Sequence, residues 1–192
     1  MMNSHFYAML FRRKYIDRWA LMRNTRKENL AEHSLETAFI AHAIAVIDNK
    51  RFGGSTDPEK AALLAMFHDT PEIITNDLST PVKYYNNDII NAYNEIEQHA
   101  VDSLLKLLPE DLRSEYEPLF DCKDEKLKLI VRAADKISAL IKCKDEIMLG
   151  NSEFSVAERS TLETVKKLGL PAADEFLDIF LESFSLPLDE QK

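Results

Sequence analysis

The sequence predicts an all-α fold in a single domain that spans residues 1–192. Only 4 of the 192 residues are glycine, whereas β-sandwiches and barrels need many turns. Apolar residues make up 45% of the chain and recur at helical spacing over long stretches. A chain of this length is also long enough to bury a core of its own.

Capping residues and apolar spacing place the first helices. Residues 4–14 are predicted to form a helix, and a basic loop follows it. Asn29 is a good N-cap and Glu32 stands three residues later, so a second helix should begin at Leu30 and end near Lys50. The apolar stripe expected on this helix consists of Leu35, Ala38, Phe39, Ala45 and Val46.

A third helix is expected after the glycine-containing loop at residues 52–55. Asp57 supplies its N-cap, and Pro58 takes the first helical position. The helix should close before Pro71, because the residue before a proline disfavours helical geometry. A loop or a short helix is expected from there to Pro81.

The second half of the chain predicts further helices with turns between them. A long helix should carry apolar residues at steps of three or four, and turns are expected after Pro109 and Pro118. A further helix is expected from about Asp124 to Leu149, where Gly150 stops it. Two more helices are expected at 152–168 and 172–182, and residues 186–189 are expected to form a tail. The apolar positions of the long helix are Ile89, Tyr93, Ile96, Ala100, Leu104 and Leu107.

Charge and composition exclude several classes of function. The net charge is -9, yet residues 12–27 carry seven basic side chains and one acidic one. An acidic body disfavours nucleic-acid polymers, whereas one basic segment can receive a small anion or simply form a solvated helix face. No apolar run is long enough to span a bilayer and the N-terminus is not a signal peptide. Two cysteines without metal-site spacing fit a cytoplasmic protein that acts away from membranes.

The pair His68–Asp69 is the most informative feature of the chain. It follows the apolar run at residues 61–67, and Glu72 comes three residues later. Such a concentration of ionisable groups at the end of an apolar helix suggests that something binds them. For His33 taken by itself, a packing or surface role is the better interpretation.

Asp135 changes this balance. Its helical neighbours Val131 and Ala139 are apolar, so its carboxylate is expected to point inward and to need a cation. Arg132 and Lys136 are too near in sequence to be ideal partners. Two histidines and two aspartates, His33, His68, Asp69 and Asp135, form a mixed nitrogen and oxygen set that suits Mn²⁺, Co²⁺, Fe²⁺ or Zn²⁺ better than Ca²⁺.

The pattern of a histidine, a His–Asp pair and a later aspartate resembles the HD-domain metal-dependent phosphohydrolases. Further segments are similar to the 5′-deoxynucleotidase branch of that superfamily, densest over residues 4–84. The fold implied is an HD-domain helical bundle with its metal site between central helices. The segments are Ser4–Phe6, Asp17–Trp19, Leu21–Asn24, Glu28–Asn29, Glu32–Leu35, Phe52–Gly54, His68–Asp69 with Glu72, Asp77–Leu78 and Thr80–Tyr84.

The resemblance implies roles for individual residues. The four metal ligands would hold one divalent ion, Co²⁺ or Mn²⁺ first, with Zn²⁺, Fe²⁺ and Mg²⁺ as alternatives. Arg18 would orient the phosphate, Trp19 would line the sugar or base pocket, and Glu72 would be the catalytic carboxylate. Asp69, Asp77, Leu78, Ser79 and Thr80 would contact the nucleotide.

Each of these roles has a plainer alternative. Trp19 could be a core aromatic, Glu72 an exposed first-turn acid, and Lys83 either an attractor of phosphate or a surface charge. The branch commonly has glycine at the position of Asn76 and proline at the position of Ser79. Asparagine tolerates left-handed geometry, so the turn should survive. Pro71 is also unusual and could shift the carboxylate of Glu72.

The implied activity is hydrolysis of deoxyribonucleoside 5′-monophosphates by a metal-dependent phosphomonoesterase. Two alternatives remain open from the sequence: an HD phosphohydrolase of another nucleotide, such as a deoxynucleoside triphosphate or an alarmone, and a non-catalytic nucleotide-binding module. The expected partners are the small nucleotide and a second copy of the chain in a homodimer.

Overall fold

The structure is a computed structural model that describes residues 3–83 and 85–192, without the side chain of Thr80. Within those residues the regular secondary structure is entirely helical, apart from one isolated antiparallel bridge between Asp17 and Asn29. The all-α prediction is therefore confirmed.

The first half of the chain follows the predicted order of helices. Side-chain oxygen Oδ1 of Asn29 accepts from the backbone N–H groups of Ala31 and Glu32, so the predicted cap at the start of α2 is present. The elements are α1 (Phe6–Leu10), the 3-10 helix η1 (Phe11–Tyr15), α2 (Leu30–Arg51), α3 (Pro58–Phe67), α4 (Glu72–Thr75) and α5 (Thr80–Lys83).

The second half departs from the prediction at one helix. The turns expected after Pro109 are wrong, because residues from Glu110 onward form a helix that contains Pro118. Acids in the first turn favour that helix, and Pro118 removes one of its hydrogen bonds without ending it. The elements are α6 (Asn87–Leu105), α7 (Glu110–Phe120), α8 (Glu125–Met148), η2 (Ser152–Phe154), α9 (Ser155–Lys167), α10 (Pro171–Phe180), η3 (Leu181–Ser185) and η4 (Leu188–Glu190).

The apolar stripe expected on α2 is wrong in part. Ala38 and Ala45 are buried, but Leu35 is 51% exposed and Phe39 is 68% exposed. The buried face instead carries Ile40, Ala41, Ile44 and Ile47. The apolar residues of α2 lie all around the helix, so their spacing alone did not select the buried face.

The chain divides into two compact units, each made of three segments, and one of the boundaries falls within α2 after Ser34. The first unit contains the residues up to Leu21, Lys27–Ser34 and Phe67–Lys123. The second unit contains Met22–Arg26, Leu35–Met66 and Asp124–Lys192.

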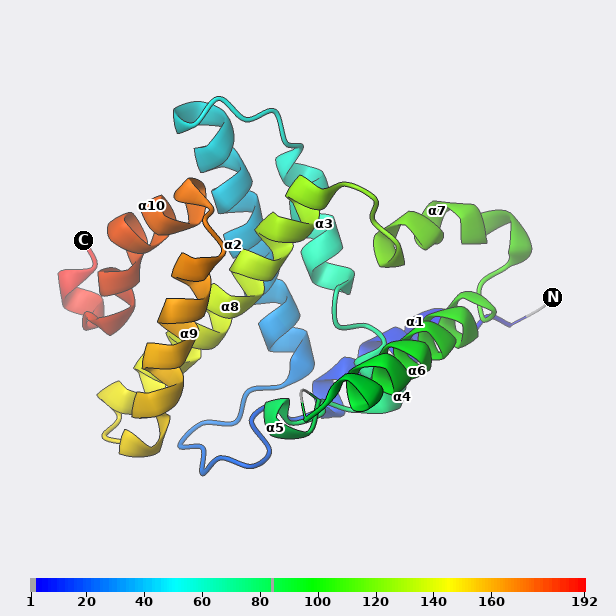
Figure 1. Cartoon of the computed structure of the whole chain (residues 1–192), viewed down its shortest axis with the longest axis horizontal. Helices are drawn as coiled ribbons and strands as arrows, with labels where there is room; N and C mark the ends of the chain where they lie inside the picture. The colour runs from blue at the N-terminus through cyan, green and yellow to red at the C-terminus, as the bar shows by residue number, and fades with distance from the viewer. Residues whose placement is uncertain (1–2, 84) are drawn as a thin grey trace. The chain divides into compact units, whose positions relative to one another are not determined.

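Aromatic side chains build the core of the first unit. Phe6 of α1 is fully buried and meets Tyr116 of α7 edge to face, with 5.2 Å between ring centroids. Phe67 packs against Tyr116 and Phe120 in the same manner. Helix α6 contacts α1, α4 and α5, as Figure 1 shows in its green and blue ribbons. This packing supports α4, which carries Glu72.

Helix α8 is the centre of the second unit. It packs against α9 and α10 (Figure 1) and buries one side over its whole length, including Ile130, Ile137 and Leu140. The side chain of Asp124 caps it by accepting from the N–H groups of Lys126 and Leu127. Its predicted stop is present, since Gly150 has a φ of 85° just beyond the last turn.

By length and composition alone, α2 could cross a membrane, and it is the one helix of the described residues with this property. The expectation that no segment is long enough to span a bilayer considered only uninterrupted apolar runs and was therefore too narrow. Half of the most apolar window of α2 is buried inside the structure, and core helices of globular proteins commonly pass the same test.

Candidate active site

Two histidines and an aspartate meet in the first unit. The Nε2 atom of His68 lies 3.1 Å from Oδ2 of Asp69, and Nε2 of His33 lies 3.6 Å from the same oxygen. The two imidazole rings have centroids 5.5 Å apart. His33 comes from the first turns of α2 and is fully buried, whereas the pair directly follows the end of α3 at Phe67.

These three residues have the spacing that a shared divalent ion requires. Two ligands at about 2.1 Å from one ion lie about 3.0 to 3.5 Å apart when they subtend an angle between 90 and 110°. The two nitrogen-to-oxygen distances are 3.1 and 3.6 Å, close to that range. Imidazole nitrogen with carboxylate oxygen is also a donor set that borderline transition metals accept. The residues therefore fit a metal.

Arg18 lies beside this cluster through its guanidinium group. Its Nη1 is 3.4 Å from Oδ2 of Asp69, and its Nε donates to Oε2 of Glu28 at 3.2 Å. All three side chains are at least four-fifths buried. A guanidinium held in this way presents planar donors in a fixed direction.

Trp19 is held at both its backbone and its ring. The indole Nε1 donates to Oε2 of Glu28 at 3.0 Å, and the backbone N–H donates to the carboxylate of Asp77. Trp19 has a φ of 59°, a left-handed conformation that is strained for a bulky residue. The surrounding contacts hold it there, and such strain is concentrated at functional sites.

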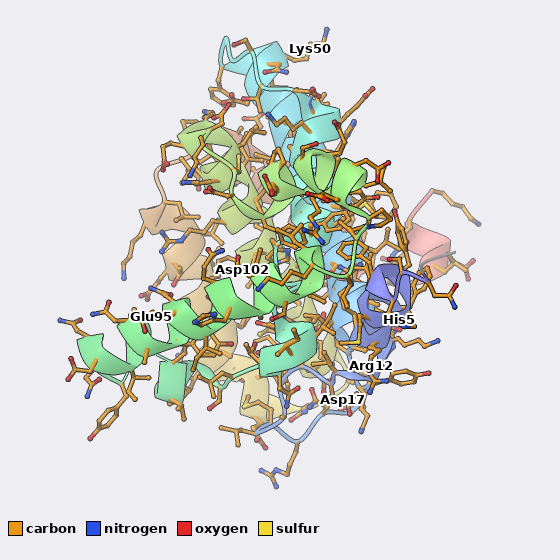
Figure 2. The ribbon with its side chains drawn as sticks, turned by 90° about the vertical axis from the view of Figure 1, so that its right-hand side faces the viewer. His5, Arg12, Asp17, Lys50, Glu95 and Asp102 are labelled. Carbon is orange, nitrogen blue, oxygen red and sulfur yellow. The ribbon has the colours of Figure 1, made fainter. Side chains whose placement is uncertain are left out.

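The backbone around Trp19 is fixed by a short antiparallel pairing. The N–H of Arg18 donates to the carbonyl of Glu28, and the N–H of Leu30 donates to the carbonyl of Ile16, both at 2.9 Å. An ion pair between Lys27 and Asp17, which Figure 2 labels, lies beside this pairing at the surface. This pairing brings Arg18 and Trp19 to the segment that leads into His33.

Glu72 is buried in the first turn of α4. The alternative interpretation of Glu72 as an exposed first-turn acid is wrong, since the residue is only 8% exposed. Burial and the nearby carboxylates of Asp69 and Asp77 together raise the pKa of Glu72 to about 9, against the opposing charges of Arg18 and Lys83. Its Oε2 is buried and has no hydrogen-bond partner among the described residues. Such an atom suits a ligand or a water molecule.

The loop after α4 carries the remaining predicted contacts. Asn76 has a φ of 63°, so the expected turn is present with asparagine in place of glycine. Burial raises the pKa of Asp77, and Arg18 opposes this effect. Leu78 and Ser79 are half-buried, while the side chain of Thr80 and all of Tyr84 lie outside the described residues. Lys83 forms an ion pair with Glu97.

Asp135, the fourth predicted ligand, belongs to the second unit. It lies midway along α8, and its side chain is 20% exposed. Its carboxylate forms an ion pair with Lys136 at 2.9 Å. Lys136, which was expected to be too near in sequence to be an ideal partner, therefore does pair with it. Its place in the metal site stays a prediction.

Two residues near the site had been given no role from the sequence. Glu28, which is 6% exposed, joins Arg18 and Trp19, and the sequence marked it only as part of a segment that resembles the family. Arg13 lies within electrostatic reach of Asp69, and burial lowers its pKa while Asp69 raises it. The excess of basic residues over 12–27 was the only signal for Arg13.

Comparisons with known proteins agree with this arrangement. Residues 5–184 match the family described as 5′-deoxynucleotidase YfbR-like. A 5′-deoxynucleotidase of Photobacterium profundum is 47% identical over 192 residues, which cover 99% of each chain. A 5′-deoxynucleotidase of Erwinia tasmaniensis is also 47% identical, over 99% of this chain and 97% of that one.

Solved structures show the same fold at low sequence identity. An HD-domain phosphohydrolase of Listeria innocua has a TM-score of 0.80 and 21% identity, over 94% of this chain and 88% of that one. The HD phosphohydrolase of cyanophage S-2L, bound to dA and one catalytic Zn²⁺ ion, has a TM-score of 0.66 and 17% identity. That match covers 92% of this chain and 95% of the cyanophage protein.

Proposed function

This chain belongs to the YfbR-like 5′-deoxynucleotidase family and is itself a 5′-deoxynucleotidase. On this basis we propose which residue performs which part of the reaction. The enzyme is a metal-dependent phosphohydrolase that converts deoxyribonucleoside 5′-monophosphates to deoxyribonucleosides and phosphate. This activity replaces the two alternatives, another nucleotide hydrolase and a non-catalytic module. The main support for the proposed roles is that Arg18, His33 and His68 all contact the same carboxylate oxygen of Asp69.

His33, His68, Asp69 and Asp135 are the proposed ligands of one divalent ion. The spacing of the first three supports this set, and the Zn²⁺ ion in the cyanophage enzyme supports a single catalytic metal. Co²⁺ and Mn²⁺ are the first candidates here, with Zn²⁺, Fe²⁺ and Mg²⁺ as alternatives. Such an ion polarises a phosphoryl group and lowers the pKa of a bound water molecule.

Arg18 is the proposed phosphate-binding residue. Glu28 holds its Nε, and its Nη1 lies toward Asp69 at 3.4 Å. A guanidinium that is fixed at one edge can offer its other donors to two phosphate oxygens at once. Arg18 would therefore align the phosphorus beside the histidine and aspartate cluster.

Trp19 and the loop of Asp77, Leu78, Ser79 and Thr80 are the proposed contacts for the nucleoside. Trp19 is rigid, because Glu28 holds the indole and Asp77 holds the backbone. A rigid ring beside the sugar would exclude a 2′-hydroxyl by its volume alone. The deoxyadenosine, dA, that the cyanophage enzyme binds is consistent with a sugar-discriminating pocket in this fold.

Glu72 is the proposed proton-transfer residue. Its backbone N–H donates to the carbonyl of Asp69 at 3.1 Å, so its position is tied to the His–Asp pair. Its buried Oε2 is available to a ligand or a water molecule. A carboxyl group there can give a proton to the departing 5′-oxygen or take one from the attacking water.

One assay tests this proposal. Phosphate release is measured from paired deoxyribo- and ribonucleoside 5′-monophosphates, after chelation and return of Co²⁺, Mn²⁺, Zn²⁺ or Mg²⁺. Arg18→Lys should lower kcat/KM for all substrates alike, because lysine keeps the charge and loses the planar fork. Trp19→Ala should instead bring the kcat/KM values for deoxyribo- and ribonucleotide substrates closer together. Equal effects of Trp19→Ala on both sugars would remove its proposed role.

A second copy of the chain is the proposed partner, and α2 offers a surface for it. Its Leu35 and Phe39 are exposed, and His42 and Val46 continue the same line. The steps of four, three and four residues match a coiled-coil seam. This spacing reads the same from either end of the helix, so two copies can pair antiparallel about a twofold axis.

Charge along α2 supports the antiparallel orientation. Glu32 and Glu36 lie toward its N-terminal end, whereas Lys50, which Figure 2 labels, lies at its C-terminal end. In an antiparallel pair the acidic end of each helix meets the basic end of the other. Opposite charges at the edges of a seam select the partner and its orientation.

The cytoplasm is the proposed compartment. Neither Cys122 nor Cys143 is in a disulfide bond, as expected where the environment is reducing. The net charge of -9 disfavours polymeric nucleic acid as a partner. The small nucleotide is therefore the proposed ligand, away from membranes.

A further inference from the structure

The segment between Trp19 and Glu28 is a loop that is closed at its base. Trp19 and Glu28 are joined by the bond between indole and carboxylate, and both belong to the first unit. The middle of the loop, Met22–Arg26, belongs to the second unit. The contacts of that middle segment explain what holds it.

A buried carboxylate holds the middle of this loop. Glu146, near the C-terminal end of α8, is 1% exposed. Its Oε2 accepts from the backbone N–H of Thr25 at 2.8 Å, and its Oε1 accepts from the backbone N–H of Arg26 at 3.2 Å. One side chain therefore binds two consecutive backbone N–H groups of the loop.

Lys142 and Asn151 complete the same network. The ammonium group of Lys142, which is 7% exposed, donates to Glu146 and to the carbonyl of Arg26. The amide of Asn151 donates to Oε2 of Glu146 at 2.8 Å and to the carbonyl of Arg23 at 2.6 Å. Asn151 itself stands just after Gly150, whose φ of 85° turns the chain back toward the loop.

A charged pair in this position is stable only when its hydrogen bonds are complete. Burying an ion pair costs free energy that its mutual attraction alone does not repay. Burial by itself raises the pKa of Glu146, yet Lys142, Asn151 and the two backbone N–H groups together lower it below its usual range. The loop supplies part of that compensation, so the network favours one loop conformation over others.

We propose that Glu146, together with Lys142, is a positioning residue that fixes the Thr25–Arg26 segment and thereby holds Trp19 in its strained left-handed conformation. Trp19 needs external restraint because a φ of 59° is unfavourable for its side chain. The base of the loop restrains it on one side, and the network at Glu146 restrains it on the other. The effect on sugar selection rests on the proposed function of Trp19.

Trp19 is the only tryptophan in the chain, so its fluorescence reports on this loop directly. Glu146→Gln keeps the side-chain volume but removes the charge and turns an amide donor toward a backbone N–H. Acrylamide quenching of Trp19 should become roughly twofold more efficient in this variant, because a loop released from its contacts opens more often. The measurement needs neither substrate nor metal and is made well below the melting temperature of each variant.

Two further variants make the test specific. Asn151→Ala removes its bonds to Glu146 and to the Arg23 carbonyl, together with the cap that its Oδ1 gives to the N–H of Glu153, and leaves both backbone bonds of Glu146 to the loop in place. It should therefore give an intermediate increase in quenching. Glu153→Gln is the matched control. Its Oε1 can still accept from the backbone N–H of Arg23 in the same loop, so the variant loses only the ion pair with the Arg23 side chain, which is 91% exposed. That control should quench as the unmodified protein does, since exposed ion pairs contribute little.

Steady-state kinetics distinguishes the positioning of Trp19 by Glu146 from the role of Trp19 in sugar selection. Glu146→Gln should raise KM more than it lowers kcat and should narrow the ratio between deoxy and ribo substrates. Unchanged quenching in folded Glu146→Gln and Asn151→Ala proteins would overturn the positioning role. Increased quenching with an unchanged sugar ratio would support the positioning role and overturn the assignment of sugar selection to Trp19.

Discussion

The indole of Trp19 donates a hydrogen bond to Glu28, 3.0 Å from Nε1 to Oε2, and Arg18 donates to that same oxygen at 3.2 Å. One buried carboxylate thus aligns the residue proposed for the phosphate and the residue proposed for the sugar. Because both donors share one acceptor, a substitution of Glu28 should weaken binding of both the phosphate and the sugar.

Glu28→Ala should raise KM for every deoxyribonucleoside 5′-monophosphate by roughly tenfold or more, since a hydrogen bond to a charged group contributes about 1.5 to 3 kcal/mol. Steady-state phosphate release gives the value. Asp17→Ala, which breaks the exposed pair with Lys27, is the control and should leave KM unchanged. If the two variants behave alike, Glu28 does not align the substrate-binding residues.

Glu72→Ala should lower turnover by roughly 10²-fold or more, the usual contribution of a group that transfers a proton. Binding of metal and of nucleotide should remain, and isothermal titration calorimetry measures both. Loss of the metal in this variant would make Glu72 a ligand or a structural residue, contrary to its proposed role. Glu95→Ala, at an exposed glutamate of α6, is a control outside the proposed chemistry.

Asp135→Ala should weaken metal binding by roughly 10²-fold, because even the residues that only support a ligand change affinity by 10 to 100-fold. Metal content after dialysis against a weak chelator gives a direct measurement. Lys136→Met removes only the ion-pair partner of Asp135 and should retain the metal. Equal metal content in both variants would exclude Asp135 from the site.

Phe39→Glu should convert a dimer of the chain to a monomer, because it places a charge in the middle of the proposed seam. Sedimentation equilibrium measures the mass. Val156→Glu is the control, since Val156 is equally exposed at 67% and lies on α9. The proposal of this surface fails if the unmodified chain is a monomer or if Phe39→Glu remains dimeric.

Glu146 should make the stability of the protein depend on acid. The fold lowers its pKa, so its contribution to stability is present above the ordinary value of 4.5 and is lost as the pH falls toward the folded value. The melting temperature of Glu146→Gln should therefore lie well below that of the unmodified protein at pH 7. The gap should shrink below about pH 4.5. A gap that stays constant with pH would show that the charge is not what stabilises the loop.

Local rules identified most of the helices from the sequence. Asn29 caps α2 and Asp124 caps α8 because each oxygen reaches N–H groups two or three residues along the chain. Gly150 ends α8 with a positive φ that other residues adopt only with strain. The His68–Asp69 pair was equally visible, since it comes directly after an apolar run.

Local rules failed where the outcome depends on distant packing. The exposed face of α2 was misassigned because apolar residues lie all around that helix, and only its neighbours decide which side is buried. The helix across Pro118 was missed because proline usually ends helices, whereas here it lies near the last turn.

The sequence by itself determined the helical class, the ends of the main helices and the residue types able to bind a metal and a phosphate. These follow from chemistry within a few residues of the chain. Only the tertiary structure decided that Glu28 joins Arg18 to Trp19, that Trp19 is left-handed, and that Glu146 binds the loop 120 residues before it. Each of these depends on donors and acceptors that folding brings together from separate segments, and no local pattern encodes such a meeting.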